Sequence, residues 1–410
     1  MAPERAPTSP AGTVSQPIGK PFNGQAKGLL WLTWRSYAGP PQYYIPPEGG
    51  ALNPSGRRQP VPDRTLGAQG QSPAAPSTLT PVRVCQPSGI LESTAQLPIP
   101  TAPQRGLSLK EVTMECALYD KNEKGICTCR LCPRRCRILP SQRGWCRTRW
   151  NDHGLLKSLT YGLVTSAALD PIEKKPLAYF HRGSFILSLG SWGCNMNCSF
   201  CQNFEISQKE PESRKVTPHQ VLRLARALTA EGNIGIAWTY NEPTLSFEFI
   251  RDTAPLIKEA GLVNVMVSNG FISPEALDRL LPLIDAWNID LKGWQPDFYR
   301  TICGAARNPV LETIRRAAEV SHVELTNLVI PGENDDPEAF EDMVRWIASL
   351  DPAMPLHITR FFPRWRMTLL PPTPVSTLVS LGKIARKYLS RVRIGNVTDE
   401  ELAEYHWRNE

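Results

Sequence analysis

Three cysteines lie close together in the segment GCNMNCSFCQN. Three residues separate Cys194 from Cys198, and two separate Cys198 from Cys201. Thiolates at short, fixed spacings are the usual ligands of iron–sulfur clusters. Three ligands on one loop leave one iron of a [4Fe-4S] cluster open, and an open position is typical of a reactive metal site. The alternative is a zinc site that a distant His or Cys completes.

A second group of cysteines precedes this loop in the segment CRLCPRRCRILPSQRGWC. Its four thiols lie within eighteen residues of one another, which predicts a second metal site. The ligands would be Cys129, Cys132, Cys136 and Cys146. A closed set of four thiolates suits a structural zinc ion or an auxiliary iron–sulfur cluster, and the spacing does not decide between them. Cys127 is a spare thiol that could substitute for one of these ligands, whereas Cys85, Cys116 and Cys303 are interpreted as bystanders.

From residue 184 onward, short apolar runs alternate with amphipathic helical patterns at intervals of roughly 30 residues. Segments 184–193 and 233–240 are expected to be strands with an amphipathic helix between them. The alternation predicts parallel βαβ units, and about six of them fit between residues 184 and 397. We therefore predict an α/β fold with an open, partial (β/α)6 TIM-like barrel, since a closed barrel has eight units. Ligands gather at the carboxyl ends of such strands, where the 194–201 loop is expected.

The cysteine loop, together with the Gln202 and Asn203 that follow it, resembles the radical S-adenosylmethionine (radical SAM) superfamily. More narrowly, the chain is similar to the branch of the pyruvate formate-lyase activating enzyme and to the group called AmmeMemoRadiSam system radical SAM enzymes. The resemblance runs from about Met114 to Val397, through DPIEKKPL, TYNEPT, SNGF, NIDLKG, FYRTICGA, LVIPGENDD and PLHITRFFP. It implies a radical SAM core in which S-adenosylmethionine chelates the open iron. One electron from the reduced cluster would then release a 5′-deoxyadenosyl radical, so the cysteines of the loop are both metal ligands and catalytic residues.

Polar residues at the expected strand ends suit a cradle for this cofactor. Glu242 could accept a hydrogen bond from the ammonium group, and the resemblance gives this position the same role. Ser268 and Asn269 suit ribose hydroxyls or the methionyl group, and Gly270 would allow close backbone approach. The alternative for Asn269 and Gly270 is a simple turn.

Four more residues are cofactor-binding candidates. Lys292 could pair with the cofactor's carboxylate, although Asp290 and Lys292 could equally form an ion pair at the barrel mouth. Phe200, just before the third cysteine of the loop, suits packing against adenine. His357 is a cofactor ligand, a substrate contact or a hydrogen-bonded core histidine.

Four regions are expected along the chain. Residues 1–106 are rich in Pro, Gly and Ser and have no apolar period, which predicts a disordered leader. Alternatively, translation starts at Met114 and the leader does not belong to the protein. Residues 107–183 are expected to form the cysteine-rich metal-binding module and a linker, 184–397 the partial barrel, and 398–410 a C-terminal tail.

Two other segments bear on the site. In DPIEKKPL, the charged residues are either substrate contacts or part of a solvated turn; they are Asp170, Glu173, Lys174 and Lys175. The resemblance also implies that relatives often continue past Val397 into a cysteine-bearing tail. Here the last cysteine is Cys303, so any role of such a tail is absent or is supplied by another element.

Charge and composition restrict the class of protein. The net charge of +7 is spread along the chain and does not indicate nucleic-acid binding. No secretory signal pattern opens the sequence, and the apolar patch 28–34 is too short to cross a bilayer. Eleven cysteines in such a chain indicate reduced thiols, so we expect a cytoplasmic protein that does not bind membranes.

Three hypotheses for function follow. The first is an enzyme that abstracts a hydrogen atom from a small molecule or peptide, with the Memo-like and AMMECR-like partners that the group name implies. The second is an activating enzyme that generates a glycyl radical on a partner enzyme. Either would need an electron donor such as flavodoxin or ferredoxin. The third is a non-catalytic iron–sulfur or zinc scaffold, which Glu242, Asp290 and Lys292 argue against, because a scaffold has no use for a cofactor cradle.

Overall fold

The structure is a computed structural model that describes residues 113–409. All of these belong to one compact unit, Pro87–Glu410. The predicted disordered leader, residues 1–106, lies outside the described residues, as does Cys85.

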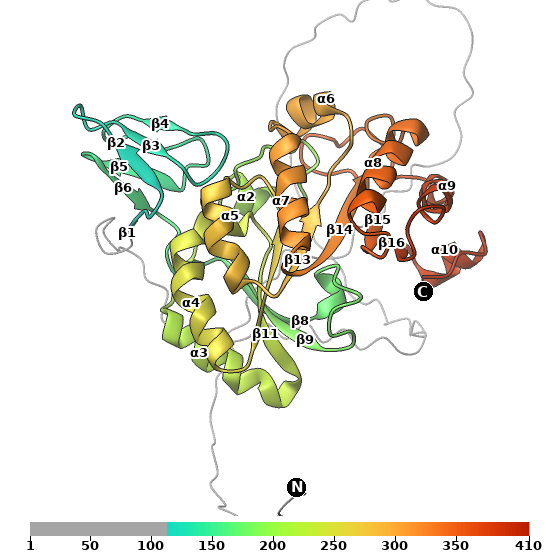
Figure 1. Ribbon diagram of the computed structural model, residues 1–410, viewed down its shortest axis with the longest axis horizontal. Coiled ribbons are helices and arrows are strands. Elements are labelled where there is room, and N and C mark those ends of the chain that lie inside the picture. The colour runs from blue at the N-terminus through green and yellow to red at the C-terminus, as the bar shows by residue number, and fades with distance from the viewer. Residues whose placement is uncertain (1–112, 410) are drawn as a thin grey trace, which may run out of the picture. The chain divides into compact units, whose positions relative to one another are not determined.

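An eight-stranded sheet lies at the centre of the described chain (Figure 1). Its order is β16-β15-β14-β13-β12-β11-β9-β8, and β8 and β16 are its two edges. Within residues 113–409, seven of its strands run parallel: β9 (Phe185–Gly190), β11 (Asn233–Trp238), β12 (Val263–Ser268), β13 (Ala286–Asp290), β14 (His322–Val329), β15 (Leu356–Arg360) and β16 (Val392–Gly395). The eighth strand, β8 (Ser166–Pro171), pairs antiparallel with β9. Because the edges do not pair, the sheet is an open barrel, and this prediction is confirmed.

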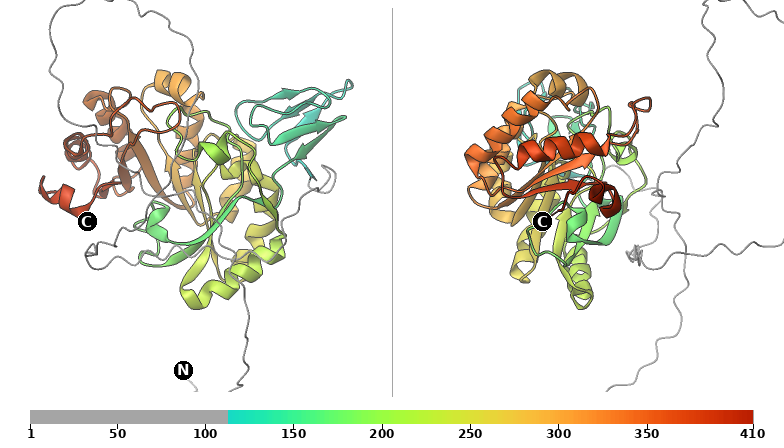
Figure 2. Two further views of the ribbon diagram at one scale, coloured as in Figure 1. Left: turned by 180° about the vertical axis from the view of Figure 1, so that it is seen from behind. Right: turned by 90° about the vertical axis from the view of Figure 1, so that its right-hand side faces the viewer.

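One main helix follows each of the first six parallel strands and covers the outer side of the sheet (Figures 1 and 2). These helices are α3 (Pro218–Ala227), α4 (Phe247–Glu259), α5 (Pro274–Leu280), α7 (Asn308–Ala318), α8 (Pro337–Leu350) and α9 (Val375–Ala385). The described chain also contains shorter helices: η1 (Ile172–Lys174), α2 (Phe204–Ser207), η2 (Leu228–Glu231), η3 (Pro243–Ser246), η4 (Leu281–Leu283), α6 (Pro296–Phe298), the π-helix η5 (Tyr299–Cys303) and α10 (Asp399–Ala403). The six predicted βα units are therefore present, and β16 adds a seventh parallel strand.

Several helices begin where the sequence supplies a capping side chain followed by proline. Thr217, Ser273 and Asp336 each accept a hydrogen bond from the backbone N–H three residues further on, at the starts of α3, α5 and α8. A proline follows each cap, in the first helical position, where its missing N–H costs no hydrogen bond. These local signals fix where the helices start and thereby the lengths of the loops at the site.

The two faces of the sheet differ in chemistry. Outward-facing residues such as Trp287, Leu325 and Ile358 are buried in the large apolar core that the sheet shares with the helices. The inward-facing residues of the same strands include Asn288 and Glu324, which bond to the segment 172–184 between β8 and β9. That segment closes the amino-terminal end of the barrel, and we call it the amino-end plug.

The cysteine-rich region forms two small antiparallel sheets. One contains β1 (Met114–Glu115), β6 (Leu155–Ser158) and β5 (Arg149–Asp152), and the other β2 (Tyr119–Lys121), β3 (Cys127–Cys129) and β4 (Arg137–Ile138). A further pair joins β7 (Leu163–Val164) to β10 (Arg214–Lys215). The sequence of this module shows no strand period, because strands of two to four residues are too short to show one.

Both ends of the barrel region differ from the expected boundaries in detail. The expected division after residue 183 is not an edge of the sheet, because β8 already pairs with β9. At the other end, Trp407 packs so closely on Gly382 that a Cβ there would lie 2.6 Å from the indole, and Arg386 stacks on the same ring. The tail therefore packs onto α9. Among residues 113–409, no helix has the length and apolar composition needed to span a bilayer.

Candidate active site

The cysteine loop leaves the carboxyl end of β9 and is held by the π-helix η5. The N–H groups of Asn197 and Ser199 donate to the carbonyls of Cys303 (2.9 Å) and Ile302 (3.0 Å). The middle cysteine of the loop is buried, and the other two are partly buried. The loop thus lies at the end of the sheet where the sequence predicted a ligand site.

The donor set of this loop fits an iron–sulfur cluster. All three donors are thiols, and they lie near enough to influence one another's pKa. Two buried polar atoms of the same loop, Ser191 Oγ and Asn197 Oδ1, have no hydrogen-bond partner among the described residues, which is typical of a surface that meets a ligand. Within residues 113–409, no three Cys, His, Asp or Glu side chains already stand in a coordinating arrangement, so binding would draw the thiols together.

The three thiols differ in how readily they ionise. Burial raises the pKa of Cys194 well above its ordinary value, and the nearby Glu242 carboxylate raises it further. Burial also raises the pKa of Cys201. A hydrogen bond from the buried Cys303 thiol lowers the pKa of Cys198. Cys303 was interpreted from the sequence as a bystander, yet it contacts the loop; its place in the segment FYRTICGA was the available signal.

Glu242 lies between β11 and η3 and is only 2% exposed. Its Oε1 accepts hydrogen bonds from the Thr244 N–H (3.1 Å), the Thr244 hydroxyl (2.8 Å) and the Ser268 hydroxyl (2.9 Å), and its Oε2 accepts one from the Asn269 N–H (2.9 Å). Burial raises the pKa of Glu242, and these hydrogen bonds oppose the rise. The Asn269 amide nitrogen also lies 3.5 Å from Cys194 Sγ. The structure therefore brings three predicted cofactor-binding residues into one network with the first cysteine.

Ser268 and Gly270 both make close contacts within the protein. Ser268 Oγ donates to Glu242 and accepts from the Gly270 N–H (3.0 Å), so the hydroxyl orients the carboxylate. Gly270 has φ of 70°, and a Cβ there would lie 2.9 Å from Ile289 and 3.0 Å from Val310. The close approach that this glycine permits is therefore to β13 and α7.

Asp290 and Lys292 form an ion pair at the end of β13, with 2.8 Å between Nζ and Oδ2. Burial opposes the charge of Lys292, but Asp290 and the Cys198 thiol outweigh it and hold its pKa well above the ordinary value. Lys292 Nζ also lies 5.6 Å from the centre of the Phe200 ring, which stacks on Phe298. A protonated lysine and an aromatic face thus lie beside the cysteine loop, next to the middle cysteine.

His357 lies inside the barrel and is paired within the protein. Its Nε2 lies 2.6 Å from Glu324 Oε2, and His322 Nε2 lies 2.9 Å from Glu324 Oε1. Burial alone would raise the pKa of Glu324, but the two histidines outweigh it and lower that pKa to about 2. The arrangement favours the core-histidine interpretation of His357 over the cofactor one.

The charged residues of DPIEKKPL divide into buried and exposed members. Asp170 and Lys175 form a buried ion pair of 2.7 Å on the inner face of the barrel, and the Tyr240 hydroxyl donates to the same carboxylate at 2.7 Å. Tyr240 was not a candidate from the sequence; it has φ of 73°, and its ring occupies the space that a side chain on Gly190 would need. The other two charged residues of the segment, Glu173 and Lys174, are partly or largely exposed.

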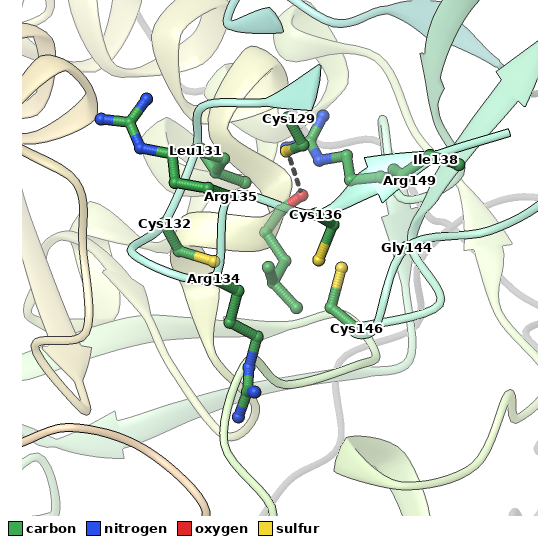
Figure 3. Close-up of a pocket in the computed structure, with 11 residues that line it drawn as sticks. Cys129, Leu131, Cys132, Arg134, Arg135, Cys136, Ile138, Gly144, Cys146 and Arg149 are labelled. Carbon is green, nitrogen blue, oxygen red and sulfur yellow. Dashed lines mark hydrogen bonds between the residues drawn. The ribbon is translucent and has the colours of Figure 1, made fainter. Parts of the chain in front are cut away.

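The second cysteine set lines one small cavity of about 10 Å³ (Figure 3). All four predicted ligands contribute to it, and they come from the end of β3, the turn before β4 and the turn before β5; they are Cys129, Cys132, Cys136 and Cys146. Burial raises the pKa of Cys129 to about 11 and that of Cys132 to about 12. Two arginines line the same cavity, Arg134 and Arg149. The spare thiol Cys127 is buried on β3 and is not among the lining residues.

Comparison with known proteins identifies relatives of the chain. A family model described as the radical SAM superfamily matches residues 191–347. The uncharacterized protein MJ0808 of Methanocaldococcus jannaschii is 40% identical over 293 residues, which cover 70% of this chain and 86% of that protein. The putative glycyl-radical enzyme activating enzyme MJ1227 of the same organism is 26% identical over 255 residues, 59% of this chain and 98% of that protein.

Two further similarities concern an activating enzyme and a solved structure. The pyruvate formate-lyase 1-activating enzyme of Escherichia coli is 26% identical over 154 residues, 36% of this chain and 62% of the enzyme. The chain thus matches less than two thirds of that enzyme's length. The crystal structure of Streptococcus suis SuiB bound to S-adenosylmethionine is 13% identical, with a TM-score of 0.43 over 54% of this chain and 53% of that one.

Proposed function

The chain belongs to the radical SAM superfamily, and from this premise we propose that it cleaves S-adenosylmethionine reductively at Cys194, Cys198 and Cys201 and abstracts a hydrogen atom from a substrate. As a radical SAM enzyme it uses a [4Fe-4S] cluster and S-adenosylmethionine. When bound, the reduced cluster supplies the electron that breaks a sulfur–carbon bond of the cofactor and yields the 5′-deoxyadenosyl radical. The protein's own residues bind, orient and shield the reactants.

The observation that carries the proposal is the buried carboxylate of Glu242. Four hydrogen bonds fix it beside Asn269, whose side chain reaches Cys194. No ion pair to Glu242 occurs among residues 113–409, although an unpaired buried carboxylate is costly. A ligand ammonium group is the partner that this geometry suits, and the cofactor carries one.

The remaining contacts of the cofactor are assigned by the same reasoning. The Lys292 ammonium would donate to the cofactor carboxylate. Asp290 Oδ2, 2.8 Å from Lys292 Nζ, would hold the lysine in place. Phe200 would pack against the adenine, since it belongs to the cysteine loop and its ring lies near Lys292. Asn269 would keep its amide toward Cys194 and thereby fix the loop against the end of β12.

Two substrate classes are proposed, and relatives favour one. Two relatives are named as activating enzymes, one of a glycyl-radical enzyme and one of pyruvate formate-lyase, which supports a glycine Cα–H on a partner enzyme as the substrate. A small molecule or peptide, processed with Memo-like and AMMECR-like partners, is the other proposal and rests on the sequence resemblance alone. A low-potential donor such as flavodoxin or ferredoxin would supply the electron in both.

The proposal is tested with anaerobically reconstituted, reduced protein by chromatography of 5′-deoxyadenosine. We expect formation in the wild type and none in the single variants Cys194→Ala, Cys198→Ala and Cys201→Ala. Cys127→Ala is the matched control, because this buried thiol belongs to neither cysteine set, and it should retain activity. Cleavage retained in any single variant of the loop would contradict the assignment.

A further inference from the structure

The four-thiol cavity has the size and charge of a site for one metal ion. Its volume of about 10 Å³ corresponds to about one water-sized sphere, so a four-iron cube would need the surrounding turns to move apart. The lining contains no Asp or Glu, and it includes the cationic Arg134, Arg135 and Arg149. A divalent ion bound by four thiolates carries a net charge of about −2. Arg134 and Arg149 lie near enough to interact electrostatically with these thiols and offset part of that charge, while Arg149 also pairs with Glu248 and Arg135 with Glu275.

Arg134 connects this cavity to the cluster loop. It lies in the turn between Cys132 and Cys136, and its side chain extends away from the thiols (Figure 3). Its Nε donates to the Asn195 carbonyl at 2.7 Å, and its Nη2 donates to the Gly304 carbonyl. The guanidinium also stacks on Trp145, 3.4 Å from the ring centre. One side chain therefore joins the turn of the four-cysteine set to the cysteine loop and to the residue that follows η5.

The other flank of the cluster loop also contacts the four-thiol turn. Gly193, directly before Cys194, has φ of 85°, and a Cβ there would lie 2.4 Å from Thr148 and 3.2 Å from the Cys146 carbonyl. No side chain fits between the two turns at this point. The residues on both sides of Cys194 are therefore packed or bonded to segments that carry ligands of the second set.

We propose that Cys129, Cys132, Cys136 and Cys146 bind a single divalent ion of the zinc class, and that this ion fixes the turn from which Arg134 holds the cluster loop. A metal that closes four thiolates supplies folding energy to a module with short strands and a small core. Filling the second site would then raise the affinity of the loop for the [4Fe-4S] cluster and slow the loss of the cluster. By linkage of the two binding free energies, the bound cluster would raise the affinity of the second site for its metal by the same factor. This coupling rests on the proposed function, whereas the single-ion site does not.

The metal content of the two sites is measured separately. The triple variant Cys194→Ala/Cys198→Ala/Cys201→Ala, purified anaerobically from medium with iron and zinc, should retain one zinc per chain and neither iron nor sulfide. Residual iron with sulfide would show an auxiliary cluster and overturn the single-ion assignment, and so would a folded variant without metal. A chain that holds zinc in the triple variant, yet never binds a cluster in the wild type, would refute the proposed function alone.

The contact of Arg134 with the cysteine loop, which we call the clamp, is tested with Arg134→Gln. This variant should keep its zinc. We expect the variant to lose cluster iron to an iron chelator roughly tenfold faster than the wild type, since two hydrogen bonds to the loop are lost. Absorbance of the cluster and EPR of its reduced form follow the loss without any turnover. Arg137→Gln is the matched control, because Arg137 is exposed on β4, and it should behave as the wild type. Equal rates for the two variants would overturn the clamp.

Discussion

Buried carboxylates are paired differently at the two ends of the barrel. We call the carboxyl end, where the cysteine loop lies, the cluster end, and the amino end, which the amino-end plug closes, the plugged end. At the cluster end, Glu242 is buried among neutral hydrogen-bond donors and no protein cation pairs with it among the described residues. Toward the plugged end, Asp170 pairs with Lys175, and Glu324 bonds to His357. All three carboxylates are buried, so burial alone does not distinguish a binding site from a structural network.

The presence of a protein partner does distinguish them. A carboxylate whose partner is internal stabilises the fold only while both members remain, because removing one leaves an uncompensated charge. A carboxylate that lacks an internal partner keeps capacity for a ligand and lowers stability until that ligand binds. We therefore expect substitutions at the two ends to separate stability from cofactor affinity.

The largest effect is expected for Lys175→Met. It removes the buried cation that pairs with the Asp170 carboxylate, since burial would raise the pKa of Asp170 and Lys175 first, then Tyr240 and Ser188, lower it. The largely exposed Lys174, 3.8 Å from Asp170 Oδ1, would remain. Removing one member of a buried pair costs about 3–5 kcal/mol in the free energy of unfolding. Denaturant unfolding measures this loss, and S-adenosylmethionine affinity of the folded fraction should be unchanged. The double variant with Asp170→Asn should recover part of the stability; no recovery would mean that the pair is not the cause.

Acid should lower the free energy of unfolding through Glu324, which lies toward the plugged end of the barrel. Its pKa is about 2 in the folded protein, against an ordinary value of 4.5, so its contribution is present above about pH 4.5 and is lost as the pH falls toward 2. The shift corresponds to roughly 3 kcal/mol, taking 1.36 kcal/mol for each pH unit. Urea unfolding between pH 6 and pH 2 measures it, and Glu324→Gln should flatten the dependence relative to the wild type. An equally steep loss in both proteins would assign the acid sensitivity to other groups.

The sequence predicted the barrel and the cluster loop because both leave local signals. Period and spacing are properties of neighbouring residues, so the βα alternation and the loop from Cys194 to Cys201 could be recognised directly. The Glu242 position was also predicted, since it follows a buried strand at the expected edge of the sheet. These predictions needed no knowledge of which distant residues meet.

The contacts at the plugged end, and the contact of Arg134 with the cysteine loop, could not be predicted in this way. Tyr240 reaches Asp170 only because Gly190 leaves room for its ring, and those three residues are far apart in the sequence. Arg134 lies in a run of arginines, and nothing local distinguishes it from exposed Arg135. In the sequence, His357 lies in an apolar strand pattern, as the residues at the cluster end do. Its partner Glu324 on β14 places it instead in the network of buried charges inside the barrel. Long-range pairing decides such cases.

A smaller effect is expected for Glu242→Gln at the cluster end. The amide keeps the volume and the acceptor Oε1 but removes the charge that would bind the cofactor's ammonium, which costs about 2 kcal/mol or roughly thirtyfold in affinity. Stability should fall by only about 1 kcal/mol, because the amide nitrogen can no longer accept from the Asn269 N–H, whereas no internal cation loses its partner. Calorimetry with the reconstituted protein measures affinity, and iron content confirms the cluster. Glu312→Gln, on the exposed face of α7, is the matched control. A variant that loses stability but not affinity would reverse the proposed difference between the two ends.

The smallest effect is expected for Tyr240→Phe, which tests whether the inner network extends toward the cluster end. The substitution removes only the hydroxyl that donates to Asp170 at 2.7 Å, while the ring keeps its place over Gly190. A hydrogen bond to a charged group contributes about 1.5–3 kcal/mol, and Lys175 still donates to the same carboxylate oxygen. We therefore expect a loss of about 1.5 kcal/mol in stability, the low end of that range. Thermal unfolding measures it, and cofactor affinity should not change. If affinity falls while stability does not, the tyrosine belongs to the binding site, and the division between a structural end and a binding end is wrong at this residue.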